Sequence, residues 1–129
     1  MSVHSRGVKP PLLPDSDALT KVPPVPKHLA PHAKAEWRRI MPQLIARRII
    51  TKGDLGGVEH YCGAVGAVRT IADTMSAGGI PDLKLGGLQI RYMQTARQLA
   101  AEYGLTPTSR TRIGVGSVDN DDADNPLVV

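Results

Sequence analysis

Phenylalanine is absent from this chain of 129 residues, and aromatic side chains of all kinds make up only 3% of it. The core must therefore rest on aliphatic side chains and methionine, which leaves it thin. Small domains bury too little surface to be stable without additional contacts. We therefore expect other copies of the chain to cover part of the apolar surface, so that the protein is a homo-oligomer.

Cysteine and long apolar segments are equally scarce. Cys62 is the single cysteine, which excludes a disulfide within the chain and is typical of a reducing compartment. No segment approaches the roughly 20 consecutive apolar residues of a membrane span. These absences predict a soluble cytoplasmic protein with no membrane partner.

The motifs of the common enzyme classes are also missing. The sequence has no Gly-Lys-Ser/Thr phosphate loop, no Gly-x-Gly-x-x-Gly after a strand and no Gly-x-Ser-x-Gly elbow. Asp54, Glu59 and Asp73 are spaced so that their carboxylates would not converge on a helix, which argues against a magnesium site. We therefore predict no catalytic residue and no cofactor.

Two pairs of residues are candidate metal ligands. His28 and His32 have the i, i+4 spacing of ligands on one helix face, but Pro31 lies between them at the expected helix start. His60 and Cys62 are two residues apart and would point in different directions. The favoured interpretation is that the histidines are solvated and that the protein has no metal site.

Positive and negative charge are unevenly distributed along the chain. Residues 1–52 hold ten Lys and Arg against three acidic residues, and residues 53–112 hold six against five. From Ile113 onward there are four aspartates and no basic residue. A basic front and an acidic tail indicate a polyanionic partner and a second partner that is basic or shielded.

Composition and periodicity divide the chain into three parts. Residues 1–30 contain six prolines and predict an arm that is extended or flexible. Residues 31–113 predict a small all-α domain, and residues 114–129 an acidic flexible tail. The first helix should begin at Pro31, with Trp37 as a core anchor and Pro42 kinking or splitting it.

The rest of the helical domain is predicted to be an antiparallel hairpin. Thr51 and Asp54 have capping-box spacing at the start of a second helix over residues 51–79, where Gly78 and Gly79 end it. Four glycines weaken this helix but allow another helix to approach closely. A third amphipathic helix follows and ends near Tyr103.

The stretch "EYGLTPTSR" at residues 102–110 predicts a joint after the third helix. Gly104 suits the left-handed position beyond a helix end, and Leu105 can fold back onto the last turn. Thr106 can then cap a new turn that has Pro107 in its first position. The joint would aim Arg110 and Arg112.

Basic clusters at "WRR", "ARR" and "SRTR" are candidates for neutralising DNA phosphates. The alternative for each side chain is a solvated charge or an ion pair between copies. No base-reading motif or aromatic stacking platform accompanies them. The predicted DNA-binding residues are Lys34, Arg38, Arg39, Arg47, Arg48, Lys52, Arg110 and Arg112, and the predicted oligomerisation residues are Leu55, Val58, Val65, Leu88, Tyr92 and Leu99.

Three stretches resemble the small subunit of tailed-phage terminases. They are "PPVPKHLAPHAKAEWRRIMPQL", "ITKGDLGGVEHYCGAVGAVRTI" and "ARQLAAEYGLTPTSRTRIGV", and the resemblance covers about residues 22–115. It implies an all-helical, ring-forming, non-catalytic subunit in the host cell cytoplasm. Such a subunit binds viral double-stranded DNA at the packaging start and delivers it to the large terminase subunit, which carries the ATPase and nuclease.

Two other classes of protein remain open from the residues alone. A helical transcriptional regulator would use the Gly104 joint as a helix-turn-helix and bind DNA as a dimer. A small metal-dependent nuclease would need the carboxylates to converge. The native mass separates the first from a large ring, and plasmid integrity with magnesium tests the second.

Overall fold

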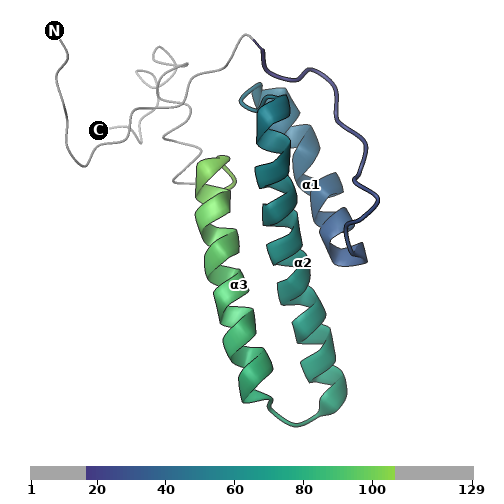
Figure 1. The fold of residues 1–129 in the computed structure, drawn as a ribbon, viewed down its shortest axis with the longest axis vertical. Helices are drawn as coiled ribbons and strands as arrows, with labels where there is room; N and C mark the ends of the chain where they lie inside the picture. Colours follow the sequence, from purple (N-terminus) through teal and green to yellow (C-terminus); the bar gives the residue numbers. More distant parts are fainter. Residues whose placement is uncertain (1–16, 107–129) are drawn as a thin grey trace, which may run out of the picture.

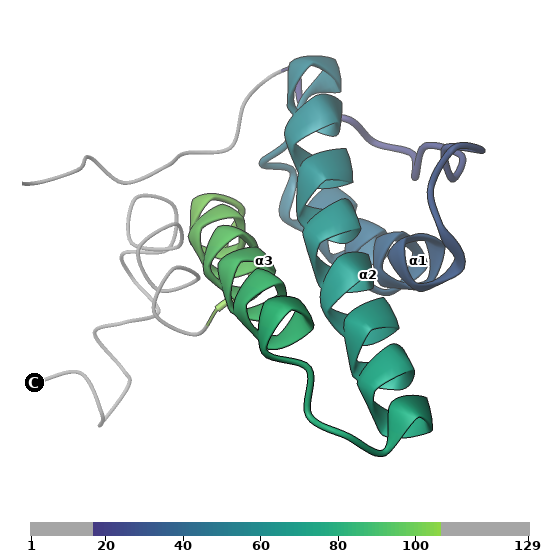
Figure 2. The ribbon, with the colours of Figure 1, turned by 60° about the horizontal axis from the view of Figure 1, so that its bottom comes forward.

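A computed structural model describes residues 17–106, and every regular element in that range is helical. Helix α1 (Pro31–Arg47) is followed by a 3-10 turn, η1 (Lys52–Asp54), and then by α2 (Leu55–Gly78) and α3 (Leu83–Glu102). Helices α2 and α3 form an antiparallel hairpin, and α1 lies along α2 on the side away from α3 (Figure 1, Figure 2). The predicted all-α class and hairpin are therefore confirmed for the described residues.

Helix α1 begins where its proline predicts. Ala30 is extended at the N-cap and Pro31 opens the helix, where a missing amide hydrogen costs nothing. Pro42 lies inside α1, but the helix continues through it to Arg47, so of the two outcomes expected there, a kink or a split, the split does not occur. Pro42 lies on the exposed side of α1.

The predicted cap between the first two helices is also present. The Thr51 amide donates a hydrogen bond to Asp54 Oδ2 over 2.8 Å, and the 3-10 turn that it closes leads directly into α2. Gly79 ends α2 with φ 70°, in the left-handed region that glycine favours. Asp82 then caps α3 by accepting a hydrogen bond from the Leu85 amide over 3.0 Å.

The core lies mainly between α1 and α2. Fully buried side chains from both helices and the loop between them form it: Trp37, Ile40, Met41, Leu44, Ile50, Val58 and Cys62. Trp37 is thus a core anchor as predicted, and its indole nitrogen donates to the Pro23 carbonyl over 3.3 Å. Helix α3 adds one buried residue, Ala100, and otherwise packs on this core with half-buried side chains.

Residues 17–30 of the predicted arm lie on the domain. Ala18 is buried, and the Leu19 amide donates to the Ile50 carbonyl over 2.9 Å. Val25 and Leu29 pack against the core. This part of the chain forms no helix or strand and contacts α1. Residues 1–16 lie outside the described range.

Glycines at two positions of α2 permit the neighbouring helices to approach closely, as predicted. A Cβ atom at Gly66 would lie 2.8 Å from the Ala33 nitrogen of α1, and one at Gly57 would overlap the Tyr103 hydroxyl. Gly57 and Gly66 are nine positions apart, which is two and a half turns, so the contacts are on opposite faces of α2. Helix α2 is therefore the central element of the domain.

The predicted joint after α3 is confirmed as far as Leu105. Gly104 has φ 69°, and the Leu105 amide donates to the Ala100 carbonyl over 2.9 Å. This is the hydrogen bond of a Schellman motif, and Leu105 packs back against the core. Pro107 and the predicted basic turn lie outside the described residues.

Candidate nucleic-acid interface

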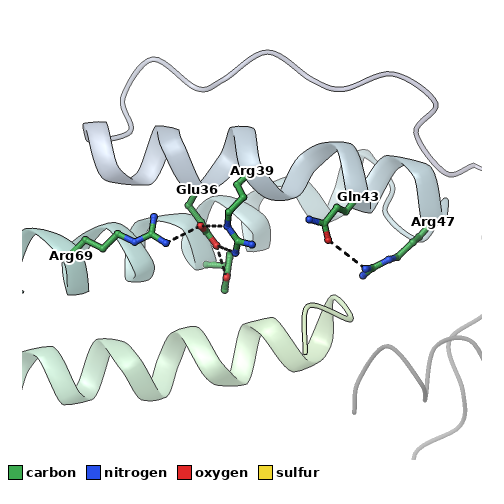
Figure 3. A network of polar contacts seen from close by, with 6 residues as sticks. Glu36, Arg39, Gln43, Arg47 and Arg69 are labelled. Carbon is green, nitrogen blue, oxygen red and sulfur yellow. Dashed lines mark hydrogen bonds and ion pairs between the residues drawn. The ribbon is translucent and has the colours of Figure 1, made fainter. Parts of the chain in front are cut away.

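A buried carboxylate sits between α1 and α2 and binds two of the arginines on this side of the domain (Figure 3). Glu36 is 1% exposed. Arg39 approaches it with two nitrogens, at 2.8 and 2.5 Å, and Arg69 of α2 lies 3.4 Å away. The Tyr61 hydroxyl donates to Glu36 Oε2 over 2.6 Å. Four side chains from two helices therefore form one charged network.

The network keeps Glu36 ionised. Burial by itself would raise the pKa of Glu36, but hydrogen bonds from Arg39 and Tyr61 and the charges of Arg39 and Arg69 outweigh it, and the pKa is lowered. Burial and the bond to Glu36 raise the pKa of Tyr61, so this hydroxyl remains a donor. Arg39, predicted to bind DNA, is thus held by a partner within its own chain.

Arg47 also has a role within the fold. Its Nη1 donates to the Gly104 carbonyl over 2.5 Å. Its Nη2 lies 3.5 Å from Gln43 Oε1 (Figure 3). The first contact joins the C-terminal end of α1 to the joint after α3. Sequence reasoning did not find this contact, because nothing local links residues that are 57 positions apart.

Four predicted DNA-binding side chains form no hydrogen bond or ion pair within residues 17–106. They are Lys34, Arg38, Arg48 and Lys52, of which Lys34 is half-buried and the others are exposed. Lys34 and Arg38 are one turn apart on α1. Arg48 and Lys52 lie between α1 and α2. Arg110 and Arg112 lie outside the described residues.

Arg48 occupies a backbone conformation that usually selects glycine. Its φ is 56°, the one positive value at a non-glycine residue among the described residues. A side chain in this region costs about 1–2 kcal/mol. Because Arg48 is exposed and strained, we infer that arginine is present at this position for what its side chain contacts.

The basic residues after α1 lie at one end of the domain. Arg47, Arg48 and Lys52 lie where α1 gives way to α2, at the top of Figure 1. The Arg47–Gly104 hydrogen bond brings the end of α3 to the same place. We call Arg47, Arg48, Lys52 and the chain exit at Thr106 the basic end.

The predicted oligomerisation residues divide into two groups. Val58 is fully buried in the core of a single chain, and Leu55, Val65 and Leu99 pack against that core. These four contribute to the fold of one chain because the core covers them. Leu88 and Tyr92 remain exposed, at 40% and 36%. Periodicity identified the apolar faces but not which element covers each one.

The turn at the opposite end of the hairpin exposes more apolar surface than the sequence indicated. Ile80 is 78% exposed and Leu83 is 89% exposed, and Ile90 and Met93 are exposed as well. Helix α1 does not reach this part of α2 and α3 (Figure 1). We call this region the hairpin tip.

The residues considered as metal ligands are dispersed. His28 lies 3.7 Å from Glu59, and His32 lies 2.7 Å from Asp73, so each histidine faces a carboxylate of α2. No group of three or more potential ligands converges within residues 17–106. Burial raises the pKa of Cys62 to about 12, so its thiol is a poor ligand. In the same range, no helix has the length and apolarity of a membrane span.

Comparison with known proteins identifies a family. A family model described as phage terminase, small subunit, matches residues 33–120. The matched range includes all three helices except the first two residues of α1. Neither the curated proteins nor the solved structures include a match to the chain.

Proposed function

Because the chain belongs to the family of phage terminase small subunits, a family with a role in phage DNA packaging, we propose that it binds viral double-stranded DNA at the packaging start. It then delivers this DNA to the large terminase subunit in the host cell cytoplasm. Members of the family are generally non-catalytic. We propose that this chain likewise recruits DNA and leaves ATP hydrolysis and DNA cleavage to its partner.

The observation that carries the proposal is that the chain leaves α3 at the basic end. The Arg47–Gly104 hydrogen bond places the exit of α3 beside Arg48 and Lys52. Arg110 is four positions beyond Thr106, a reach of at most about 14 Å. The clusters at 46–48 and 109–112, separate in the sequence, can therefore contact one stretch of DNA backbone.

The other predicted DNA-binding residues differ in how available their side chains are for contact with a phosphate. Arg39 holds Glu36, so contact with a phosphate would compete with a buried carboxylate. Arg38 has no such partner within residues 17–106 and is exposed. We therefore place the DNA contacts on Arg48, Lys52, Arg110 and Arg112, with Lys34 and Arg38 as flanking contacts. Such contacts neutralise phosphates and are weakened by salt.

Self-association is the second part of the proposal. Leu88 and Tyr92 are exposed apolar side chains one turn apart on α3. Contact of this pair with another copy would cover surface that the chain leaves open. In a ring, each copy adds a basic end, and several weak phosphate contacts together hold DNA much more tightly than one.

Charge reversal tests the DNA contacts. In R48E/K52E we expect the slope of log affinity against log salt to fall by about 2 per bound copy, because two phosphate contacts are lost. The control is K27E, which reverses an exposed charge before the other end of α1, about 25 Å away along a 17-residue helix. Equal DNA retention by R48E/K52E and K27E would refute the interface.

The native mass tests the assembly. We expect a closed ring of many copies, with and without viral end DNA, and loss of the ring in L88D/Y92D. A dimer that binds a short palindrome would favour the transcriptional regulator instead. A single chain of 13.8 kDa at all concentrations would refute self-association. Plasmid degradation with magnesium or manganese would refute the non-catalytic role.

A further inference from the structure

The hairpin tip contains an open apolar hollow. The hollow has a volume of about 860 Å³ between the end of α2 and the start of α3. Met75, Ile80, Leu83 and Ile90 line it, and Gly86 and Gly87 of α3 contribute no side chain to its wall. This size is within the usual range for sites that hold a small ligand or a few side chains. In Figure 2 the tip is turned forward and stands clear of α1.

The hollow continues as a row along one side of α3. Leu83, Ile90 and Arg97 follow one another at seven-residue spacing, so they lie on the same side of the helix. Leu88 lies about 200° around the helix from Ile90. The row is therefore separate from the Leu88–Tyr92 pair that we assign to self-association.

The charged side chains of α3 before Glu102 are all basic. Between Leu83 and Ala101 the sequence has Lys84, Arg91 and Arg97 and no acidic residue. All three side chains are exposed, and none forms a hydrogen bond or ion pair with the rest of the chain between residues 17 and 106. An acidic segment that ends in apolar residues would complement both the row and the hollow.

The chain itself contains such a segment. Asp119, Asp121, Asp122 and Asp124 are followed by Pro126, Leu127, Val128 and Val129. We propose that residues 119–129 dock along α3 of their own chain, with the aspartates beside Arg97 and Arg91 and with Leu127 and Val128 in the hollow of the hairpin tip. Charge and apolar surface are then matched in the same order along both partners.

The length of the connection suits docking within one chain. From Glu102, the hollow at Ile90 to Leu83 lies about 18–29 Å back along α3, at 1.5 Å per residue. A coil of 21 residues, the separation of Thr106 and Leu127, has an end-to-end distance of about 25 Å. When these lengths match, the effective concentration of the segment at its site is at its maximum, in the mM range.

Docking of this kind makes the hairpin tip a regulated surface. The acidic segment would shield the arginines of α3 while it is bound and expose them when it leaves. This inference does not depend on DNA binding, because both partners are in the same chain and neither includes the basic end.

Methyl NMR of the full chain tests the docking. The methyl resonances of Ile80 and Ile90 report on the hollow, and that of Ile40, fully buried near Trp37, is an internal reference. In L127S/V128S we expect the Ile80 and Ile90 resonances to shift while Ile40 is unchanged. The matched control V115S/V118S, which also replaces two apolar tail residues, should leave all three in place.

Other outcomes overturn the proposal. Identical Ile80 and Ile90 resonances in wild type and L127S/V128S would show that the segment does not occupy the hollow. Resonances that change on dilution but not in L127S/V128S would assign the hollow to another region of a second copy. An effect of L127S/V128S that disappears on dilution would place the segment on a second copy and refute docking within one chain.

Discussion

The Tyr61 hydroxyl donates a hydrogen bond over 2.6 Å to Glu36 Oε2, which joins the N-terminal part of α2 to α1 inside the domain. Arg39 and Arg69 approach the same carboxylate from the exposed side. A buried charge is tolerated only when its partners satisfy it. The packing of α1 on α2 therefore depends on polar contacts as well as on the apolar core.

Removal of the Tyr61 hydroxyl should destabilise the domain. We expect Y61F to lower the free energy of unfolding by about 1.5–3 kcal/mol, the usual contribution of a hydrogen bond to a charged group. Urea unfolding measures the change. The control is Y92F, because the Tyr92 side chain is exposed and forms no hydrogen bond within residues 17–106. Equal stability of Y61F and Y92F would show that the bond contributes nothing.

The Glu36 network should make the free energy of unfolding depend on pH in the acidic range. Its pKa in the folded chain is below the ordinary value of 4.5, so its contribution is present above that value and is lost as the pH falls through the folded-state pKa. We expect E36Q to be less stable than wild type at neutral pH and to lose less further stability below about pH 4.5. Urea unfolding across this range measures both; parallel curves would contradict the assignment.

Alanine substitutions at two glycines of α2 should have opposite effects. A Cβ atom at Gly66 would lie 2.8 Å from the Ala33 backbone nitrogen, so G66A should cost about 1–3 kcal/mol through overpacking. No atom lies within 4 Å of a Cβ at Gly63, so G63A should stabilise the helix by up to about 1 kcal/mol. Thermal unfolding measures both. If G66A were as stable as G63A, the α1–α2 contact would be looser than described.

Cys62 should be unreactive until the protein unfolds. Burial, with a smaller contribution from the Glu36 charge, raises the pKa of its thiol to about 12, so little thiolate exists near neutral pH. We expect alkylation by iodoacetamide to follow the fraction of unfolded chain across a urea titration. Rapid labelling without urea would show that the space between α1 and α2 opens readily.

Glycine at position 48 should separate stability from DNA binding. R48G relieves a left-handed residue and should raise the free energy of unfolding by about 1 kcal/mol. Under the proposed function, it also removes one phosphate contact and should weaken DNA retention. Urea unfolding and a DNA-retention assay on the same preparation measure the two effects. Stabilisation with undiminished retention would remove Arg48 from the interface.

The helix ends were predictable because their signals are local. Pro31 begins α1, the Thr51–Asp54 cap precedes α2, and Gly104 ends α3 with Leu105 folded back. Each depends on residues only a few positions apart. The continuation of α1 through Pro42 was not predictable in the same way, because packing of the helix on α2 outweighs one missing hydrogen bond.

The contacts of the charged and apolar side chains were harder to predict from the sequence. Glu36 and Arg39 are three residues apart, so their pairing had a local signal that was not used. That Tyr61 and Arg69 complete the network depends on how α2 docks, which no local pattern specifies. For the same reason, the sequence pattern predicts Val58 as a contact between copies, whereas it is fully buried in the core of one chain.

The two ends of the domain expose different side chains: cations where α1 meets α2, and mainly apolar side chains at the turn between α2 and α3. The domain is therefore polar along the axis of the hairpin. Copies packed side by side in parallel in the proposed ring would give it one positively charged face and one apolar face. A partner that approached one face of such a ring would meet basic side chains, and a partner that approached the other face would meet apolar ones. The two faces would differ without any additional structural element.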